Sequence, residues 1–173
     1  MKKGVEKRYL PEFVYGSIDG TITTFAIVAG SFGASLNSAI ILILGFANLF
    51  ADGFSMAVSN YLSTKSQKDL DIKDKREQKN PIETAIATFI AFVVIGFIPL
   101  ISFVLALFIP ALNSNKFLFS IALTGLAFVI IGAIKGDITE KSKFKSALET
   151  LIIGGMAALI AFIVGYLLKG IAG

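Results

Sequence analysis

The chain has 173 residues, of which 55% are hydrophobic and 16% are charged. Soluble domains carry roughly 25% charged residues, so this composition excludes an ordinary soluble domain and indicates an integral membrane protein. Cysteine and histidine are absent, which excludes disulfides, thiolate ligands and sites or proton relays built on histidine. The net charge of +4 does not indicate nucleic-acid binding, because membrane topology explains where the basic residues lie along the chain.

Five apolar stretches are each close to or above the ~20 residues that cross a bilayer. They cover residues 13–33, 37–62, 82–108, 117–134 and 147–168. The sequence therefore predicts an all-α integral membrane protein, a single transmembrane domain of five helices. A cleaved signal peptide is the alternative for the first stretch, but that stretch is too long and contains Asp19.

Lysine and arginine residues predict the orientation of these helices. The N-terminal tail has four, the segment after the second helix six and the segment after the fourth helix four, whereas the other side has only Lys116 and Lys169. Because cytoplasmic loops carry an excess of basic residues, the N-terminus is predicted to be cytoplasmic and the C-terminus outside.

The connections between helices differ in length and charge. The first turn, residues 33–37, is short and uncharged, whereas the connector 63–81 is basic and long enough to extend the second helix into the cytoplasm. That connector is either a solvated link or a metal-collecting surface, whose acids would be Asp69, Asp71, Asp74 and Glu77. Pro99 is expected to kink the third helix, and Gly136 with Asp137 is expected to form the last cytoplasmic turn.

Two acids lie inside the first two apolar stretches. Asp19 precedes Gly33 by fourteen residues, and Asp52 follows Asn37 by fifteen. At ~1.5 Å per residue, both carboxylates are predicted roughly 21–23 Å from the outer turn, at one level on neighbouring antiparallel helices. An acid in a bilayer costs at least ~2.5 kcal/mol on insertion scales, so such residues usually face a polar pathway.

Two carboxylates at one depth have few stable arrangements. One acid can hold a proton, since burial and a like charge both disfavour the ionised form, or a cation can lie between them. Asn48, Asp52 and Met56 follow at four-residue spacing, on one stripe of the second helix. Oxygen ligands suit Mg²⁺, Ca²⁺ and Mn²⁺, and a thioether shifts the preference toward Fe²⁺ and other transition metals. The alternatives are that Met56 only packs and that the acids only hold helices together.

Two motifs are specific: DGTITTFAIVAG at residues 19–30 and ADGFSMAVSNYL at residues 51–62. They resemble the vacuolar iron transporter family, which includes the yeast-type vacuolar cross-complementer and the plant nodulin-21-like proteins. Weaker similarity covers most of the remaining chain, at Asn80-Pro81, Ile98-Pro99-Leu100, Gly132 with Lys135, and Gly154 with Gly165.

The resemblance implies a five-helix protomer that dimerises and moves Fe²⁺, sometimes Mn²⁺, out of the cytosol in exchange for protons. The family's pathway acid and methionine fall on Asp19 and Met56, and an acid at the cytoplasmic entrance matches Glu12. Some members carry a glutamate where this chain has Asn48, and Asp52 is its candidate replacement on the physical argument above. Plant members insert a glutamate-rich metal-binding bundle after the second helix, for which this connector is too short.

The sequence thus predicts proton-coupled export of a divalent transition metal, with a passive cation channel and a non-transporting membrane scaffold as alternatives. An enzyme is not expected, because no nucleophile–base pair or nucleotide loop is present, and no cofactor is expected. The predicted metal pathway consists of Asp19, Asp52, Met56, Glu12, Asn48 and Thr23.

The expected partners are metal ions, protons, membrane lipid and a second copy of the chain. The homodimer would pair the first helices, with Gly16, Gly20 and Gly30 permitting close approach. A bias toward Ile, Lys and Phe, without Trp, suggests a prokaryotic plasma membrane.

Overall fold

The computed structural model describes residues 2–70 and 79–171, with side chains from residue 8 onward in the first range. The helices are α1 (Lys2–Gly33), α2 (Ser38–Leu70), α3 (Pro81–Gly96), α4 (Ile101–Phe108), α5 (Lys116–Ile138) and α6 (Lys143–Leu168), with 3-10 turns η1 (Ile98–Leu100) and η2 (Pro110–Leu112). Within these residues, five segments are long and apolar enough to cross a membrane, one of them formed by α3 and α4 together. This confirms the predicted all-α, multi-pass membrane fold.

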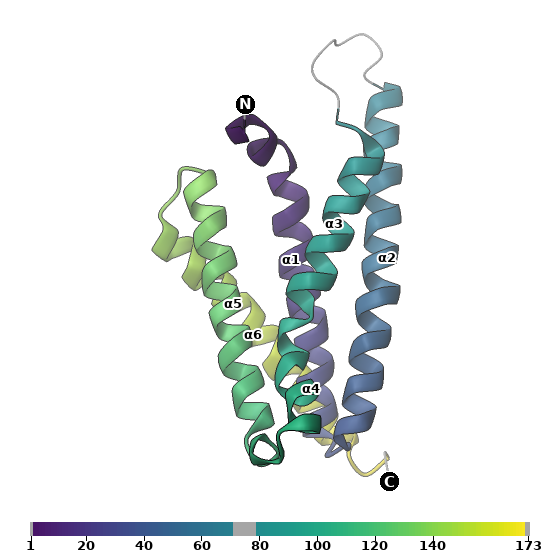
Figure 1. Ribbon diagram of the computed structural model, residues 1–173, viewed down its shortest axis with the longest axis vertical. Helices are drawn as coiled ribbons and strands as arrows, with labels where there is room; N and C mark the ends of the chain where they lie inside the picture. Colours follow the sequence, from purple (N-terminus) through teal and green to yellow (C-terminus); the bar gives the residue numbers. More distant parts are fainter. Residues whose placement is uncertain (1, 71–78, 172–173) are drawn as a thin grey trace.

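Helix α1 lies at the centre of the bundle. It packs against α3 and α6, and also against α2 and α5 (Figure 1). The N-terminus and the α5–α6 turn lie at one end of the molecule and the C-terminus at the other, as the predicted orientation requires (Figure 1). The core between the helices is apolar, and its fully buried side chains include Val28, Ile41, Leu49, Phe92 and Phe103.

The third membrane segment is interrupted at Pro99, as the sequence predicts. Proline has no N–H to donate, so the α-helical bonding stops and η1 turns the chain before α4 begins. The buried Ser120 hydroxyl of α5 donates a hydrogen bond of 2.6 Å to the Pro99 carbonyl oxygen. This bond ties the interruption to α5.

The glycines of α1 make contacts other than the expected ones. A Cβ atom built on Gly16 or Gly20 would lie 2.5 Å from a backbone carbonyl oxygen of α3. One built on Gly30 would lie 3.2 Å from a carbonyl oxygen of α6. The prediction that these glycines pair the first helices of two copies is therefore wrong, because α3 and α6 of the same chain occupy their surfaces.

The end of one helix differs from expectation. Helix α5 continues through Gly136 and Asp137, so the last cytoplasmic turn comes after Ile138. Helix α2 runs on to Leu70, into the connector, as anticipated. Three acids of the predicted metal-collecting surface, Asp71, Asp74 and Glu77, lie outside the described residues.

Candidate functional site

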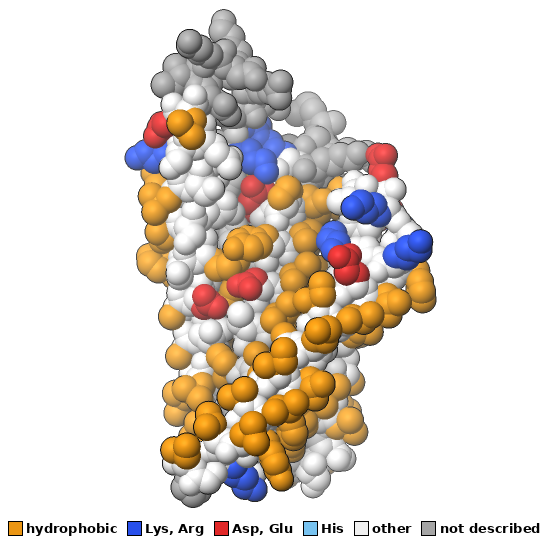
Figure 2. Space-filling model, turned by 180° about the vertical axis from the view of Figure 1, so that it is seen from behind, with side chains coloured by type: hydrophobic (Ala, Val, Ile, Leu, Met, Phe, Trp, Pro, Cys, Tyr) orange, Lys and Arg blue, Asp and Glu red, His pale blue; other side chains and the backbone are white. Residues whose placement is uncertain are grey.

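The two membrane acids lie in the middle of long helices. Asp19 is at mid-length of α1 and Asp52 near mid-length of α2, and the short turn between Gly33 and Ser38 holds these helices antiparallel. Both acids are half-buried, and their charges are close enough to interact. Figure 2 shows acidic side chains within the otherwise apolar and uncharged middle of one face. The helical hairpin therefore brings the carboxylates together at one level.

Neither carboxylate has a side-chain hydrogen-bond or ion-pair partner among the described residues. In the described part of the chain, no side chain donates a hydrogen bond to Asp19 or Asp52, and no lysine or arginine forms an ion pair with them. Their oxygens thus remain available for a proton or a cation.

Asn48 and Thr23 link the two helices one turn away from the acids. The Asn48 amide nitrogen donates to the Thr23 hydroxyl oxygen over 3.3 Å, and that hydroxyl donates to the Asp19 backbone carbonyl over 2.9 Å. The hydroxyl proton of Thr23 is therefore engaged, whereas the Asn48 amide oxygen stays available.

Met56 lies one turn beyond Asp52 toward the connector. Its side chain is buried and belongs to the apolar core, together with Phe92 of α3. In this conformation the thioether packs against apolar neighbours.

Glu12 is not an open acid at the entrance. It is 7% exposed, and its two carboxylate oxygens lie 2.8 and 3.1 Å from the Lys79 ammonium nitrogen. Lys79 directly precedes Asn80, whose side chain caps the start of α3. The predicted entrance carboxylate is thus neutralised by a lysine of the same chain.

Sequence reasoning also missed a row of polar contacts between α2 and α3. The Asn60 amide donates to the Thr88 hydroxyl, and the Thr64 and Thr84 hydroxyls share a hydrogen bond of 3.1 Å. The four-residue spacing of Asn60 with Thr64, and of Thr84 with Thr88, is the signal that could have identified this row.

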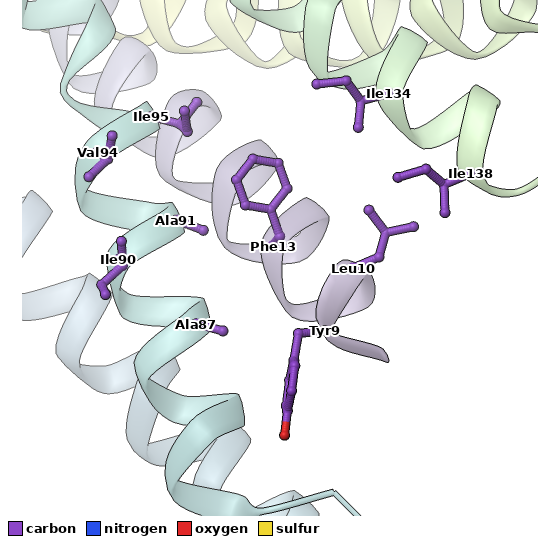
Figure 3. Close-up of a pocket in the computed structure, with 10 residues that line it drawn as sticks. All are labelled: Tyr9, Leu10, Phe13, Ala87, Ile90, Ala91, Val94, Ile95, Ile134 and Ile138. Atoms are coloured by element: carbon purple, nitrogen blue, oxygen red, sulfur yellow. The ribbon is translucent and has the colours of Figure 1, made fainter. Parts of the chain in front are cut away.

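Two grooves flank the N-terminal half of α1. One, of about 500 Å³, is lined by Asp19 and by Lys135 of α5, whose ammonium is 3.3 Å from Glu149. The other, of about 520 Å³, lies between α1, α3 and α5 and is lined by apolar side chains and Tyr9 (Figure 3). Since no carboxylate lines the second groove, it is not a metal site.

One protomer does not contain a dense metal cluster. Among the residues that the structure describes, no group of three or more Asp, Glu, His or Cys side chains gathers in a geometry suited to a metal ion. Within this range the acid pair, with Asn48 one turn away, is the part of the predicted pathway that the fold assembles.

The sequence matches the model of the VIT family over residues 10–79 and 68–166. The chain belongs to the VIT family. Its relatives include the "Vacuolar iron transporter" of Plasmodium berghei, which is 28% identical over 95% of this chain and 84% of the relative. "Vacuolar iron transporter 1" of Arabidopsis thaliana is 27% identical, over 87% of this chain and 82% of the relative.

The alignments with individual relatives differ in length. The alignment with the Plasmodium berghei protein spans 229 positions, at least 56 more than the 173 residues of this chain. "Vacuolar iron transporter homolog 4" of Arabidopsis thaliana aligns over only 165 positions, at 27% identity, over 90% of this chain and 81% of the relative.

Proposed function

We propose that this VIT-family chain exports Fe²⁺, and also Mn²⁺, from the cytosol in exchange for protons. The observation that carries the proposal is the carboxylate pair of Asp19 and Asp52, half-buried in membrane-crossing helices and without side-chain partners in the described part of the chain. Relatives named vacuolar iron transporters support iron as the metal.

The chemistry of exchange follows from the low polarity around the pair. Two adjacent carboxylates in such a setting are stable only when a cation or protons neutralise them. Metal binding releases the protons, and protonation on the other side releases the metal. Asn48 supplies an amide oxygen and Thr23 a hydroxyl oxygen to the bound ion, and the Met56 sulfur favours a softer ion. Glu12 attracts the arriving cation once Lys79 has moved away.

A second copy of the chain would complete the site. Asp19 and Asp52 each keep part of their surface exposed in one protomer, at a depth where lipid cannot solvate a charge. A two-fold contact between these faces would shield the acids and bring four carboxylates together. We place this homodimer in a prokaryotic plasma membrane, on the basis of the amino-acid bias.

Transport by purified protein in liposomes tests the function. Fe²⁺ and Mn²⁺ uptake is measured with and without a pH gradient, for the wild type, D19N, D52N and the control D137N, whose acid lies at the exposed end of α5. We expect gradient-driven uptake that D19N and D52N reduce at least about tenfold and D137N leaves unchanged. Uptake indifferent to pH would favour a channel, and transport unaffected by either acid substitution would overturn the proposed site.

The absence of native cysteine makes the dimer testable by disulfide cross-linking. Tyr15 of α1 is 58% exposed beside the groove of Asp19, whereas Val94 of α3 lines the apolar groove of Figure 3. We expect Y15C to form a disulfide-linked dimer in membranes and V94C to form no cross-link. Equal behaviour of the two variants would contradict this arrangement.

A further inference from the structure

A basic cavity opens where α5 turns into α6. Its volume is about 740 Å³, and its lining includes Lys135, Thr139, Lys141, Lys145, Ser146 and Glu149. Three lysines against one glutamate give this cavity a net charge of plus two. Because Glu149 is paired with Lys135, and because Lys141 and Lys145 form no ion pair within the described residues, two ammonium groups remain unneutralised.

The wall of this basic cavity also contains an unused hydrogen-bond donor. Ser146 is only 5% exposed, and its hydroxyl has no hydrogen-bond partner among the residues that the structure describes. A buried polar group without a partner is unfavourable, so an acceptor oxygen in the cavity would satisfy it. The cavity also lies at the N-terminus of the 26-residue helix α6, whose dipole favours an anion.

The surroundings of the basic cavity point to an anion carried by a lipid. The α5–α6 turn, whose residues line the cavity, lies at the same end as the N-terminus, and this end is predicted to face the cytoplasm (Figure 1). From its edge, the exposed side chains of Phe144, Leu148 and Ile152 follow one side of α6 into the membrane segment. Figure 2 shows basic side chains gathered beside a tilted apolar band.

We propose that the basic cavity binds the phosphate of an anionic phospholipid from the cytoplasmic leaflet. Lys141 and Lys145 pair with the phosphate, the Ser146 hydroxyl donates to one of its oxygens, and an acyl chain lies along Phe144 and Leu148. Basic pockets between transmembrane helices on this side of a membrane are suited to anionic head groups. The apolar band favours a lipid over free phosphate, because a free phosphate ion would make no contact with the band.

Competition binding to purified protein in detergent tests this proposal. Retention of phosphatidylglycerol against phosphatidylcholine is measured by native mass spectrometry, with inorganic phosphate as a competitor. The variants are K141Q/K145Q, S146A and the matched control K143Q, whose lysine lies on the same turn but pairs with Asp137 outside the cavity.

We expect the wild type to retain phosphatidylglycerol preferentially, and K141Q/K145Q to bind it about 25-fold more weakly, at roughly fivefold per lysine. S146A should weaken binding about threefold, and K143Q should bind like the wild type. An unchanged K141Q/K145Q, or a K143Q that loses as much, would overturn the site. Displacement of the lipid by millimolar inorganic phosphate would instead indicate a free-anion site. The variant K141R/K145R, which keeps both charges, should retain the lipid and separates loss of binding from loss of folding.

Discussion

The ion pair of Glu12 and Lys79 gives the sharpest prediction about how the bundle is held together. It joins α1 to the start of α3 across 67 residues of sequence, and the carboxylate is almost completely buried. Replacing Lys79 by alanine would leave a buried charge without its partner. We expect this change to destabilise the protein more than any exposed lysine substitution.

The size of the effect follows from the geometry of the pair. At 2.8 Å and an effective dielectric constant of 20, the gross attraction is about 6 kcal/mol, most of which desolvation offsets. Removing one partner from a buried pair typically costs about 3–5 kcal/mol. The Lys79 side chain is 31% exposed, so water screens part of its charge, and we expect K79A to cost about 2–3 kcal/mol. Adding E12Q removes the stranded charge and should recover about half of that loss.

Unfolding in mixed detergent micelles, followed by far-ultraviolet circular dichroism, measures these free energies. The double-mutant cycle comprises the wild type, K79A, E12Q and K79A/E12Q, with K65A on the exposed cytoplasmic part of α2 as control. A coupling energy below about 0.5 kcal/mol, or a K79A no less stable than K65A, would refute the reasoning.

Two further predictions concern packing. G20A places a Cβ against the backbone of α3 and should destabilise the protein by about 1–3 kcal/mol in the same unfolding assay. In the control G155A, the new Cβ would meet no neighbouring atom of the described residues within 4 Å, so this change should be neutral or slightly stabilising. A G20A as stable as G155A would disprove the close contact. S120A removes the hydrogen-bond donor to the Pro99 carbonyl and should lower the free energy of unfolding by about 1–2 kcal/mol. The control S63A removes an exposed hydroxyl and should have no measurable effect. Equal unfolding midpoints for the two variants would argue against the bond.

The acid pair could be predicted from the sequence because two simple rules apply to it. A charge inside an apolar stretch is conspicuous, since the bilayer makes it costly. The short turn between α1 and α2 fixes the antiparallel register, so counting residues from that turn places Asp19 and Asp52 at one level. The number of membrane-crossing helices followed equally well from run length, whereas the orientation drawn from lysine placement stays a prediction.

The neighbours of each helix could not be predicted in this way. In water an apolar stripe marks the buried side of a helix, but in a membrane the side facing lipid is apolar as well. Gly16 and Gly20 therefore looked equally suited to a second copy of α1 and to α3, and only the three-dimensional structure distinguishes these contacts. The ion-pair partner of Glu12 could not be predicted either, because no local sequence pattern relates Glu12 to a lysine 67 residues later.

Several uncharged polar residues of this bundle form hydrogen bonds between membrane segments, whereas the side chains of the two membrane acids form none in the described part of the chain. Asn48 bonds to Thr23, Asn60 to Thr88, and Ser120 to the Pro99 carbonyl, and each of these bonds connects two different membrane segments. Asp19 and Asp52 depart from this pattern, since within the described residues neither carboxylate accepts a hydrogen bond from another side chain. If the two acids served only to join helices, they would be expected to share a proton or accept such bonds, as the other polar groups do. Carboxylates that have no side-chain partner in the described part of the chain, and remain half-exposed in membrane-crossing helices, support the cation-binding role proposed above over a purely structural one.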